Sequence, residues 1–573
     1  MGSRVGELHR SQLITTFGIG SIYDALDFSL TVAGLDFWKI DRTEEIREER
    51  LEKKLGVDRF RRPKVSDNPG DANIPCFRFP KWVFCPKCKT LAHYNDFGGV
   101  EKKICESCSS RRGKHPLVPA RLVVACRNGH IDDFPWSWWV HKGADCDKPR
   151  LKISSTGRST ALSSVVVMCK TCDARRSLGG IFGKGGLAGT KCFGKRPWLR
   201  DKERCDLSPE VLQRGSASVY FPVIESAISI PPFSNRLNSF LRQHETALKY
   251  VPAEALSKAV VELLARAGEK MDPALVIRAL REREGFFSKE DSGDLRAEEY
   301  LALSYPGKPE TRGDFCARAE KIPPPYSLLF SRVVLVDRLR EVSALVAFNR
   351  IDPNGPMRAR ISREDTDWLP GMEVRGEGIF IELDANAIER WKQKQSDFIA
   401  QRIGKIEKIR KALKDTGFWV HDTPVTPEFV LIHTLSHLLI LRLTIDCGYS
   451  SSSLRERLYV GPGKEGSAGM HGLLIYTATT DSEGSLGGLV RQGLPARFSE
   501  VLAGAIEQAR WCSGDPLCIE SDGQGLNSLN LAACHTCALL PETACELRNC
   551  YLDRGLLIGR PDRPEAGFFS ATP

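Results

Sequence analysis

The sequence predicts an α+β multidomain fold, and three observations support that class. Its 573 residues are enough for about three to four domains of ordinary size, each able to bury its own core. Hydrophobic residues make up 42% and charged residues 27% of the chain, as in soluble globular proteins. Segments with a 3.6-residue period alternate with runs rich in Val, Ile and Phe, so both helices and strands are expected.

The N-terminal part divides into two segments. Residues 1–75 form a lead-in whose glycines and apolar residues suit short strands and turns, and its charged stretch EEIREERLEKKLG predicts a helix that ends at Gly56. Residues 76–215 hold eleven cysteines among many Gly and Pro residues. Small ribbons stapled by metal ions have this composition. Strand-like runs such as LVPARLVVAC and SSVVVMC deliver cysteines to their turns.

Three further segments follow. Residues 216–300 have helical periodicity in RLNSFLRQ, AEALSKAVVELLARAG and PALVIRALRERE. Residues 301–424 contain the strand-like runs SRVVLVDRLREVSALVAFNRI and GEGIFIEL, and they end in one long basic helix. Residues 425–573 mix helices, the buried strand GLLIYTA and a second group of cysteines.

The cysteines indicate bound metal more than disulfides. No apolar run approaches the roughly 18 residues that span a bilayer, and the N-terminus lacks the apolar core of a signal peptide. We therefore expect a cytoplasmic protein with no membrane segment. In that compartment thiols stay reduced, so most of the nineteen cysteines are not expected to form disulfides.

The strongest metal-binding pattern is a pair of C-x2-C motifs. Cys85 and Cys88 form the first motif, and Cys105 and Cys108 form the second. Two thiolates from one tight turn grip one edge of a tetrahedral Zn²⁺ ion, so two such turns complete a site. A closed four-thiolate site of this kind has a structural role and predicts a zinc ribbon.

A third C-x2-C motif lies further along the same segment. Cys169 and Cys172 form it, and we expect Cys192 and Cys205, in the basic stretch GTKCFGKRPWLRDKERC, to complete the site. Between these motifs lies a mixed set with acceptable zinc-ligand spacing: Cys126, His130, His141 and Cys146. The alternative is that the two histidines only pack or form hydrogen bonds beside the nearby tryptophans Trp136, Trp138 and Trp139.

The C-terminal stretch LAACHTCALLPETACELRNC contains a fourth C-x2-C motif, Cys534 and Cys537. We expect Cys518 and Cys545 to complete this zinc site, with Cys512 and Cys550 as possible substitutes. The sequence thus predicts two to four structural Zn²⁺ ions. It also refines the fold class to an N-terminal basic module rich in zinc ribbons, a helical middle and a mixed α/β C-terminal zinc-binding domain.

Two histidines outside these sets share one helix face. His433 and His437, in HTLSHLLI, are four residues apart, as in metallopeptidases. No Glu stands beside the first histidine and the surroundings are apolar, so we expect packed, hydrogen-bonded side chains instead.

The charge distribution indicates a polyanionic partner. The chain carries a net charge of +10, and residues 81–215 hold 26 Lys and Arg against 12 Asp and Glu. Such a basic module most often contacts nucleic acid, although it can also offset the charge of zinc-bound thiolates. The expected phosphate contacts are Arg175, Arg176, Lys191, Lys195, Arg196 and Arg200.

The sequence contains none of the usual nucleotide-hydrolysis motifs. The stretch nearest to a phosphate-binding Walker A loop is GTKCFGKR, which ends in Arg instead of Ser or Thr and includes an expected zinc ligand. A DExD/H box is absent as well. We therefore expect no ATPase activity in this chain and no catalytic residues.

Several long motifs resemble a known family. HTLSHLLI, LLIYTATTDSEGSLGGLV, WCSGDPLC and LAACHTCALLPETACE resemble the MrfA-like zinc-binding domain, which accompanies superfamily 2 helicases. SQLITTFGIGSIYD, RFPKWVFCPKC, VPARLVVACRNGHIDDFPW and SVYFPVIESAISIPP resemble the DrmB family of DISARM-type bacterial anti-phage defence systems. The resemblance covers nearly the whole chain.

This resemblance implies a partner and a role. A separate DrmA-like helicase subunit would supply ATP hydrolysis, and the two subunits would bind phage DNA beside a methyltransferase of the same system. The chain is then expected to be a non-catalytic DNA-binding scaffold. The alternative hypothesis is a metal-dependent nuclease or hydrolase, in which the mixed set of two cysteines and two histidines would hold a zinc ion with an open position.

Overall fold

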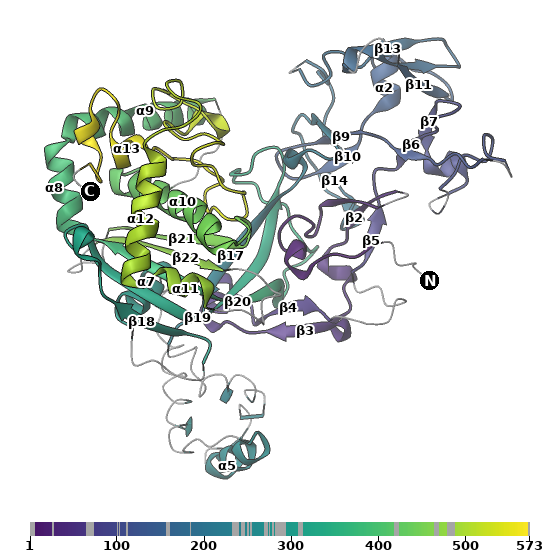
Figure 1. The fold of residues 1–573 in the computed structure, drawn as a ribbon. Helices are drawn as coiled ribbons and strands as arrows, with labels where there is room; N and C mark the ends of the chain where they lie inside the picture. Colours follow the sequence, from purple (N-terminus) through teal and green to yellow (C-terminus); the bar gives the residue numbers. More distant parts are fainter. Residues whose placement is uncertain are drawn as a thin grey trace. The chain divides into compact units, whose positions relative to one another are not determined.

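Figure 1 shows the fold in a computed structural model of the chain. The structure describes all residues except 1–5, 26–27, 65–73, 100, 102, 111–112, 156, 158–160, 184, 232–239, 242–243, 245–246, 249–250, 253–254, 269–272, 274–275, 278–279, 281–293, 307–312, 417–422, 463–468, 478–486 and 571–573. The chain forms two compact units. The first comprises residues 1–46, 57–225 and 343–372, and the second comprises residues 47–56, 226–342 and 373–573.

The first unit is built from short strands, and its longest described sheet has the order β13-β12-β11-β7-β6-β8. Smaller sheets have the orders β1-β2-β5, β10-β9-β16 and β14-β15. The elements of this unit are β1 (Ile22–Asp24), β2 (Ser29–Val32), β3 (Thr43–Ile46), β4 (Arg59–Pro63), β5 (Cys76–Arg78), β6 (Trp82–Phe84), β7 (Thr90–His93), β8 (Val118–Pro119), β9 (Leu122–Ala125), β10 (Ile131–Asp133), α2 (Trp136–His141), β11 (Leu151–Ser155), β12 (Val165–Cys169), β13 (Arg175–Ser177), β14 (Lys195–Arg196), β15 (Asp201–Lys202) and β16 (Glu210–Gln213).

The second unit combines long strands with helices, and its strands follow the order β17-β19-β20-β22-β21, with β18 also paired to β19. The boundary between the units falls within β17, β19 and β20. The elements are α1 (Glu49–Leu55), β17 (Phe221–Ile228), α5 (Leu256–Arg266), α7 (Leu295–Ser304), β18 (Cys316–Glu320), β19 (Phe330–Asn349), β20 (Trp368–Leu383), α8 (Ala385–Lys394), α9 (Ser396–Asp415), α10 (Pro427–Cys447), β21 (Leu454–Gly461), β22 (Met470–Thr477), α11 (Gly488–Gln492), α12 (Pro495–Ala509) and α13 (Gly555–Ile558).

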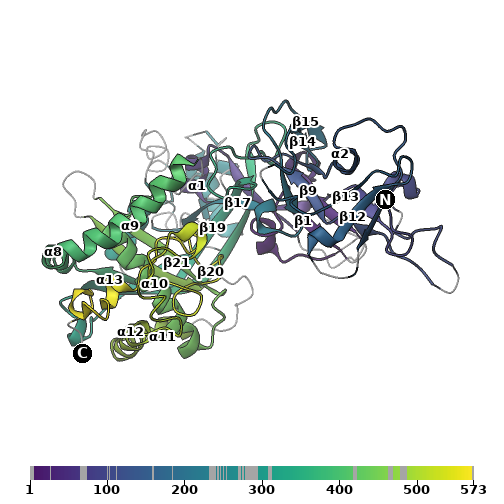
Figure 2. The same ribbon diagram turned by 90° about the horizontal axis from the view of Figure 1, so that it is seen from above.

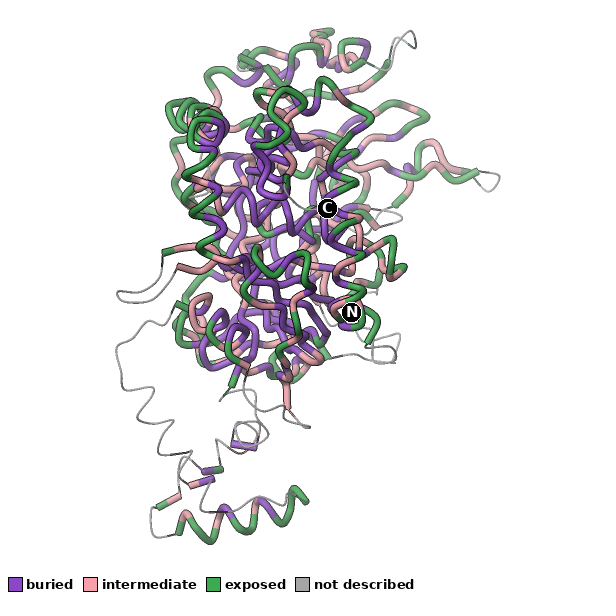
Figure 3. The backbone as a smooth tube through the Cα atoms, turned by 60° about the vertical axis from the view of Figure 1, so that its left-hand side comes forward, coloured by how far each residue is buried: buried purple, intermediate pink, exposed green. Residues whose placement is uncertain are grey.

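Helix α10 is the centre of the second unit. Its ends follow from the sequence: the Thr426 hydroxyl accepts a hydrogen bond from the Phe429 N–H, Pro427 occupies the first turn, and Gly448 ends the helix with φ +71°. Every residue from Phe429 to Ile440 is buried. Figure 3 shows buried residues in purple, and they gather in the interior of the protein. The helix packs against β21, β22, α12 and α13 (Figure 1). It shares one hydrophobic core with α8 and α9, which lie near it in Figure 2.

The length and apolar composition of α10 would also allow it to cross a membrane. However, 72% of its most apolar window is buried inside the protein. A core helix passes the same test by length and composition, so this helix is weak evidence for a membrane span.

The prediction of a mixed α and β architecture is confirmed, with two local differences. The long basic helix is two helices, α8 and α9, because Gln395 departs from helical geometry and its buried amide donates to the Glu565 carbonyl at 3.2 Å. The helix that ends at Gly56 begins only at Glu49, and the residues before it form β3. Much of two further predicted helices, RLNSFLRQ and PALVIRALRERE, lies outside the described residues.

Candidate metal centres and a candidate nucleic-acid surface

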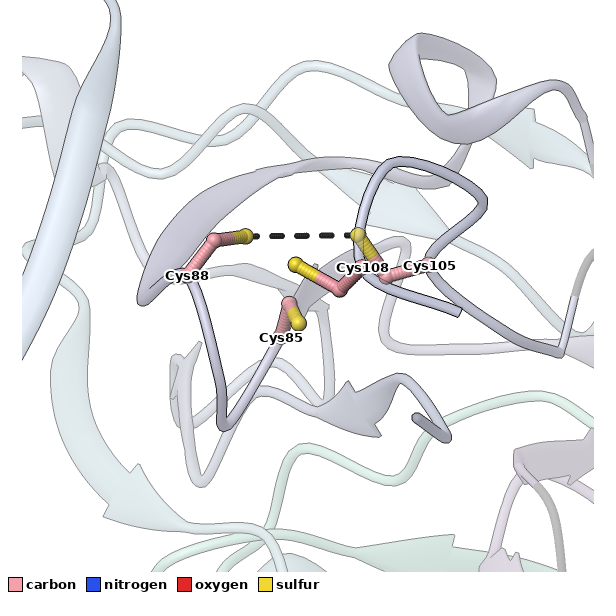
Figure 4. A group of neighbouring side chains, drawn as sticks. All are labelled: Cys85, Cys88, Cys105 and Cys108. Carbon is pink, nitrogen blue, oxygen red and sulfur yellow. Dashed lines mark hydrogen bonds between the residues drawn. The ribbon is translucent and has the colours of Figure 1, made fainter. Parts of the chain in front are cut away.

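The structure brings together the four cysteines of the predicted ribbon. Cys85 and Cys88 lie in the turn between β6 and β7, and Cys105 and Cys108 lie in a second turn that faces it (Figure 4). Their ligand atoms all lie within 4.8 Å of one another, and the sulfurs of Cys88 and Cys105 are 3.9 Å apart. The N–H of Lys89 donates to the Cys85 carbonyl at 2.8 Å and closes the first turn. This arrangement fits a tetrahedral Zn²⁺.

A second group combines Cys126, His130, Cys192 and Cys205. Strand pairing explains it: β9 and β16 are antiparallel with Ala125 opposite Glu210, so the residues after β9 meet the residues before β16. The Cys126 sulfur lies 3.3 Å from Nδ1 of His130 and 3.9 Å from the Cys205 sulfur.

The other ring nitrogen of His130 is held by a carboxylate. Its Nε2 lies 2.6 Å from Oε1 of Glu203. A metal-binding histidine commonly donates its second N–H to such a carboxylate, which fixes the ring orientation and the tautomer. Glu203 is therefore a hydrogen-bond partner of a candidate ligand and not a ligand itself. The sequence analysis did not identify this residue. The only signal in the sequence was an acidic residue two positions before Cys205 in the stretch DKERC.

A third group combines His141, Cys146, Cys169 and Cys172. Leu151 of β11 pairs with Cys169 of β12 in an antiparallel register, so Cys146 and Cys172 lie at the same end of the two strands. The sulfurs of Cys146 and Cys169 are 3.9 Å apart. His141 Nδ1 donates to the Ser137 carbonyl at 2.7 Å, which leaves the buried Nε2 without a hydrogen-bond partner among the described residues.

The second and third groups differ from the ligand sets that the sequence predicts. The C-x2-C motif of Cys169 and Cys172 is completed by His141 and Cys146, instead of Cys192 and Cys205. The mixed set of Cys126, His130, His141 and Cys146 is divided between two sites. The reason is that antiparallel partners, and not neighbours in the sequence, set which ligands meet.

The fourth group consists of Cys512, Cys518, Cys534 and Cys537. The Cys534 sulfur lies 3.5 Å from that of Cys512 and 3.8 Å from that of Cys537, and the Cys518 sulfur lies 3.7 Å from that of Cys537. Cys512 thus takes the place that the sequence assigned to Cys545. Cys545 lies elsewhere, with its sulfur 3.3 Å from Nε2 of His433.

Each group contains a thiol whose pKa is lower than that of an ordinary cysteine. A hydrogen bond from Cys126 lowers the pKa of Cys192 to about 4, and one from Cys537 lowers the pKa of Cys518 to about 5. Burial opposes the ionisation of Cys88 and Cys169, but hydrogen bonds lower the pKa of each to about 6. Hydrogen bonds and burial raise the pKa of another thiol in each group, namely Cys105, Cys126, Cys146 and Cys537. One cysteine of each group is therefore the first to form the thiolate, which is the form that binds metal.

The six basic residues expected to contact phosphate differ in their surroundings. Lys191, Lys195, Arg175 and Arg200 are exposed. Arg196 forms ion pairs with Asp201 at 2.8 Å and with Glu203 at 2.7 Å, and Arg176 lies 3.6 Å from the centre of the Trp139 ring. The guanidinium groups of Arg196 and Arg176 are therefore already engaged within the first unit.

A pocket of about 360 Å³ lies beside the second metal group. Its lining includes His130, Trp138, Lys191, Phe193 and Lys195. The Phe193 side chain is 68% exposed, and the Lys195 ammonium lies 5.8 Å from its ring centre. An exposed aromatic ring between lysines can stack a base while the lysines contact phosphate. Sequence reasoning identified the lysines and missed Phe193.

A buried arginine supports the second group. Arg350 is fully buried and donates to the carbonyls of Gly129 at 2.8 Å and Gly20 at 2.7 Å, and also to the carbonyl of Val219. Gly129 lies in the turn between Cys126 and His130. Arg350 therefore fixes the backbone that carries two candidate ligands.

Replacing Arg350 with methionine should weaken zinc binding at the second group by about 10- to 100-fold, the usual effect of losing an outer-shell contact. The three carbonyls would lose their donor, and each unsatisfied buried group costs about 1–3 kcal/mol. Competition with a chromophoric chelator measures the affinity. Arg358→Met, at an exposed position, is the matched control. Equal zinc affinity in both variants would contradict the bracing role of Arg350.

Comparisons with known proteins place the fourth group, Cys512, Cys518, Cys534 and Cys537, within a matched zinc-binding domain. A family model described as a domain of unknown function (DUF8724) matches residues 9–221, and the MrfA Zn-binding domain matches residues 435–538. The "DISARM protein DrmB" of Bacillus paralicheniformis is 32% identical over 95% of this chain and 99% of its own length. A crystal structure of the DUF1998 helicase MrfA bound to DNA matches with 9% identity and a TM-score of 0.18, over 35% of this chain and 21% of that one.

The fold and its cysteine groups define an α+β protein that contains structural zinc ions, one of them in an MrfA Zn-binding domain. The chain belongs to the DrmB family of DISARM proteins.

Proposed function

We propose that the chain is a non-catalytic DNA-binding scaffold that works with a DrmA-like superfamily 2 helicase subunit in bacterial anti-phage defence. Membership of the DrmB family supports the role in defence. The absence of a Walker A loop and a DExD/H box from the sequence supports a separate source of ATP hydrolysis. A DNA methyltransferase of the same system would act beside this pair, in the cytoplasm.

The four groups described above would each hold one structural zinc ion. Two groups offer four cysteines, and the other two offer three cysteines and one histidine. Four protein ligands fill the tetrahedral shell and leave no position for a reactive water. For this reason the alternative of a metal-dependent nuclease or hydrolase, for which the mixed set of two cysteines and two histidines was the expected open zinc site, is not part of the proposal.

The observation that carries the proposal is the exposed aromatic and basic surface beside the second group. Lys191 pairs with Asp206 at 3.9 Å and Lys195 pairs with Asp132 at 2.8 Å. Such exposed ion pairs are worth little, so a phosphate can compete for either lysine. Phe193 lies between these lysines in the sequence, and Trp138 lines the same pocket. We infer that the DNA backbone and an unstacked base contact this surface.

The double variant Lys191→Glu/Lys195→Glu should bind DNA more weakly and with less dependence on salt. Each lost phosphate contact removes about 0.7–0.9 from the slope of log K against log salt concentration, so the slope should become shallower by about 1.4–1.8. Fluorescence anisotropy over a salt series, with the chain alone and with the co-purified helicase subunit, measures this slope.

The matched control is Lys408→Glu/Lys411→Glu, which changes the same charge at two exposed lysines on α9. An equal loss in the control would contradict the assigned surface and indicate a general charge effect. Failure of the helicase subunit to co-purify with the unaltered chain would contradict the scaffold role.

A further inference from the structure

A fifth group of ligand-type side chains lies in the core of the second unit and includes none of the cysteines assigned above. It consists of His433, His437, Glu456 and Cys545. The histidines occupy adjacent turns of α10, Glu456 lies on β21, and Cys545 lies in the C-terminal loop. All four residues are buried, and their ligand atoms lie within 4.8 Å of one another.

The separations are close to the edges of a zinc tetrahedron. With bonds of about 2.0–2.3 Å, two ligand atoms of a tetrahedral zinc ion lie about 3.3–3.8 Å apart. Nε2 of His433 lies 3.1 Å from Oε1 of Glu456 and 3.3 Å from the Cys545 sulfur. Nε2 of His437 lies 3.5 Å from the same carboxylate oxygen. A single ion fits between these atoms after small adjustments.

The surrounding contacts orient these atoms towards the centre of the group. His437 Nδ1 donates to the Ala538 carbonyl at 2.8 Å, which leaves the Nε2 lone pair free for an ion. The Cys545 sulfur accepts from the N–H groups of Leu547 at 3.3 Å and Asn549 at 3.2 Å, and these two bonds fix the position of the sulfur. Three side-chain atoms of the group have no hydrogen-bond partner among the described residues: Nδ1 of His433, Nε2 of His437 and Oε2 of Glu456. The last two are atoms that can bind an ion at the centre of the group.

A buried polar atom without a partner costs about 1–3 kcal/mol, so atoms of this kind call for an explanation. A bound divalent ion would explain these atoms, because the carboxylate of Glu456 and the thiolate of Cys545 would balance its charge. Two imidazoles, one carboxylate and one thiolate suit zinc, which binds nitrogen, oxygen and sulfur ligands in tetrahedral sites.

We propose that His433, His437, Glu456 and Cys545 form a further structural zinc site. It would tie α10 to β21 and to the C-terminal loop, and so join the hydrophobic core to the cysteine group of the MrfA Zn-binding domain. The match to that domain covers residues 435–538, so it includes neither His433 nor Cys545. The inference does not depend on DNA binding or on the helicase partner.

Metal analysis of the purified full-length chain tests the site. The variant Cys545→Ser should contain one zinc ion fewer than the unaltered protein, as should His433→Gln. Cys550→Ser is the matched control, because Cys550 is also buried but belongs to none of the groups. Unchanged zinc content in both folded variants would overturn the proposal and leave a metal-free hydrogen-bonded network.

Zinc X-ray absorption of the unaltered protein gives an answer even if the variants fail to fold. With the four cysteine-rich groups alone, two of sixteen ligand atoms are nitrogen. With the fifth site occupied, five of twenty are nitrogen or oxygen. A light-atom share near one in four supports the site, and a share near one in eight overturns it.

Discussion

Removal of zinc from the purified chain should unfold the cysteine-rich part of the first unit, between residues 76 and 215. A structural zinc ion contributes an apparent 10–16 kcal/mol in small zinc modules at neutral pH, whereas a whole domain is stable by only about 5–15 kcal/mol. The ribbon is the most dependent part, because among its described residues the hydrophobic cluster has four buried members, Val83, Cys85, Cys105 and Leu117. Two of these four are metal-ligand candidates.

Hydrogen exchange measured by mass spectrometry would detect this unfolding. After treatment with a strong chelator, peptides from the ribbon and from the paired strands β9 and β16 should lose protection. Peptides from the parts of β19 and β20 that belong to the second unit, residues 330–342 and 373–383, should retain it. Re-addition of Zn²⁺ is the control, and it should restore protection. Full protection of the ribbon after verified metal loss would contradict the structural role of its ion.

The C-x2-C motifs were readable from the sequence because their ligands are local. Cys85 with Cys88, and Cys534 with Cys537, lie in single turns, and the spacing alone places two sulfurs on one side. The general architecture was readable for a similar reason, since local runs of apolar residues mark long elements such as α10 and β19.

The remaining ligands could not be assigned from the sequence because strand register decides them. Cys205 meets Cys126 only because β16 pairs with β9, and Cys146 meets Cys169 only because β11 pairs with β12. Cys545 follows the Cys534 motif closely in the chain, yet it lies under α10 beside His433. The spacing of cysteines along the sequence contains no information about such distant partners.

Ion pairs in the core could not be predicted from the sequence either. Nothing in the spacing of Glu299 and Arg457 indicates that they meet, but the structure places both side chains in the core of the second unit. Arg457 donates to the two oxygens of Glu299 at 2.7 Å and 2.8 Å, in a bidentate pair. The Tyr459 hydroxyl and the Ile228 N–H donate to the same carboxylate at 3.2 Å and 2.9 Å. Glu299, which lies on α7, therefore accepts hydrogen bonds from β21 and β17 and ties the three elements together.

Replacing Glu299 with glutamine should lower the free energy of unfolding of the second unit by about 3–5 kcal/mol, because it leaves the buried Arg457 without its main counter-charge. Urea unfolding, followed by exchange of β21 peptides, measures this change. The matched control is Glu298→Gln on the same helix: Glu298 is 33% exposed and pairs with Arg50, so its loss should cost far less. Equal effects in the two variants would contradict a special role for the buried pair.

The effect of Glu299→Gln should also depend on pH. Burial opposes the ionisation of Glu299, but Arg457 and Arg296 hold its pKa below the usual 4.5 in the folded protein. A carboxylate with a depressed pKa stabilises the fold above its unfolded pKa and loses this contribution as the pH falls through its folded value. The difference between the unaltered chain and the glutamine variant should thus be largest near neutral pH and shrink below about pH 4.5. A difference that grows on acidification would show that Glu299 is buried in its protonated form, and the bidentate pair with Arg457 would then not be ionic.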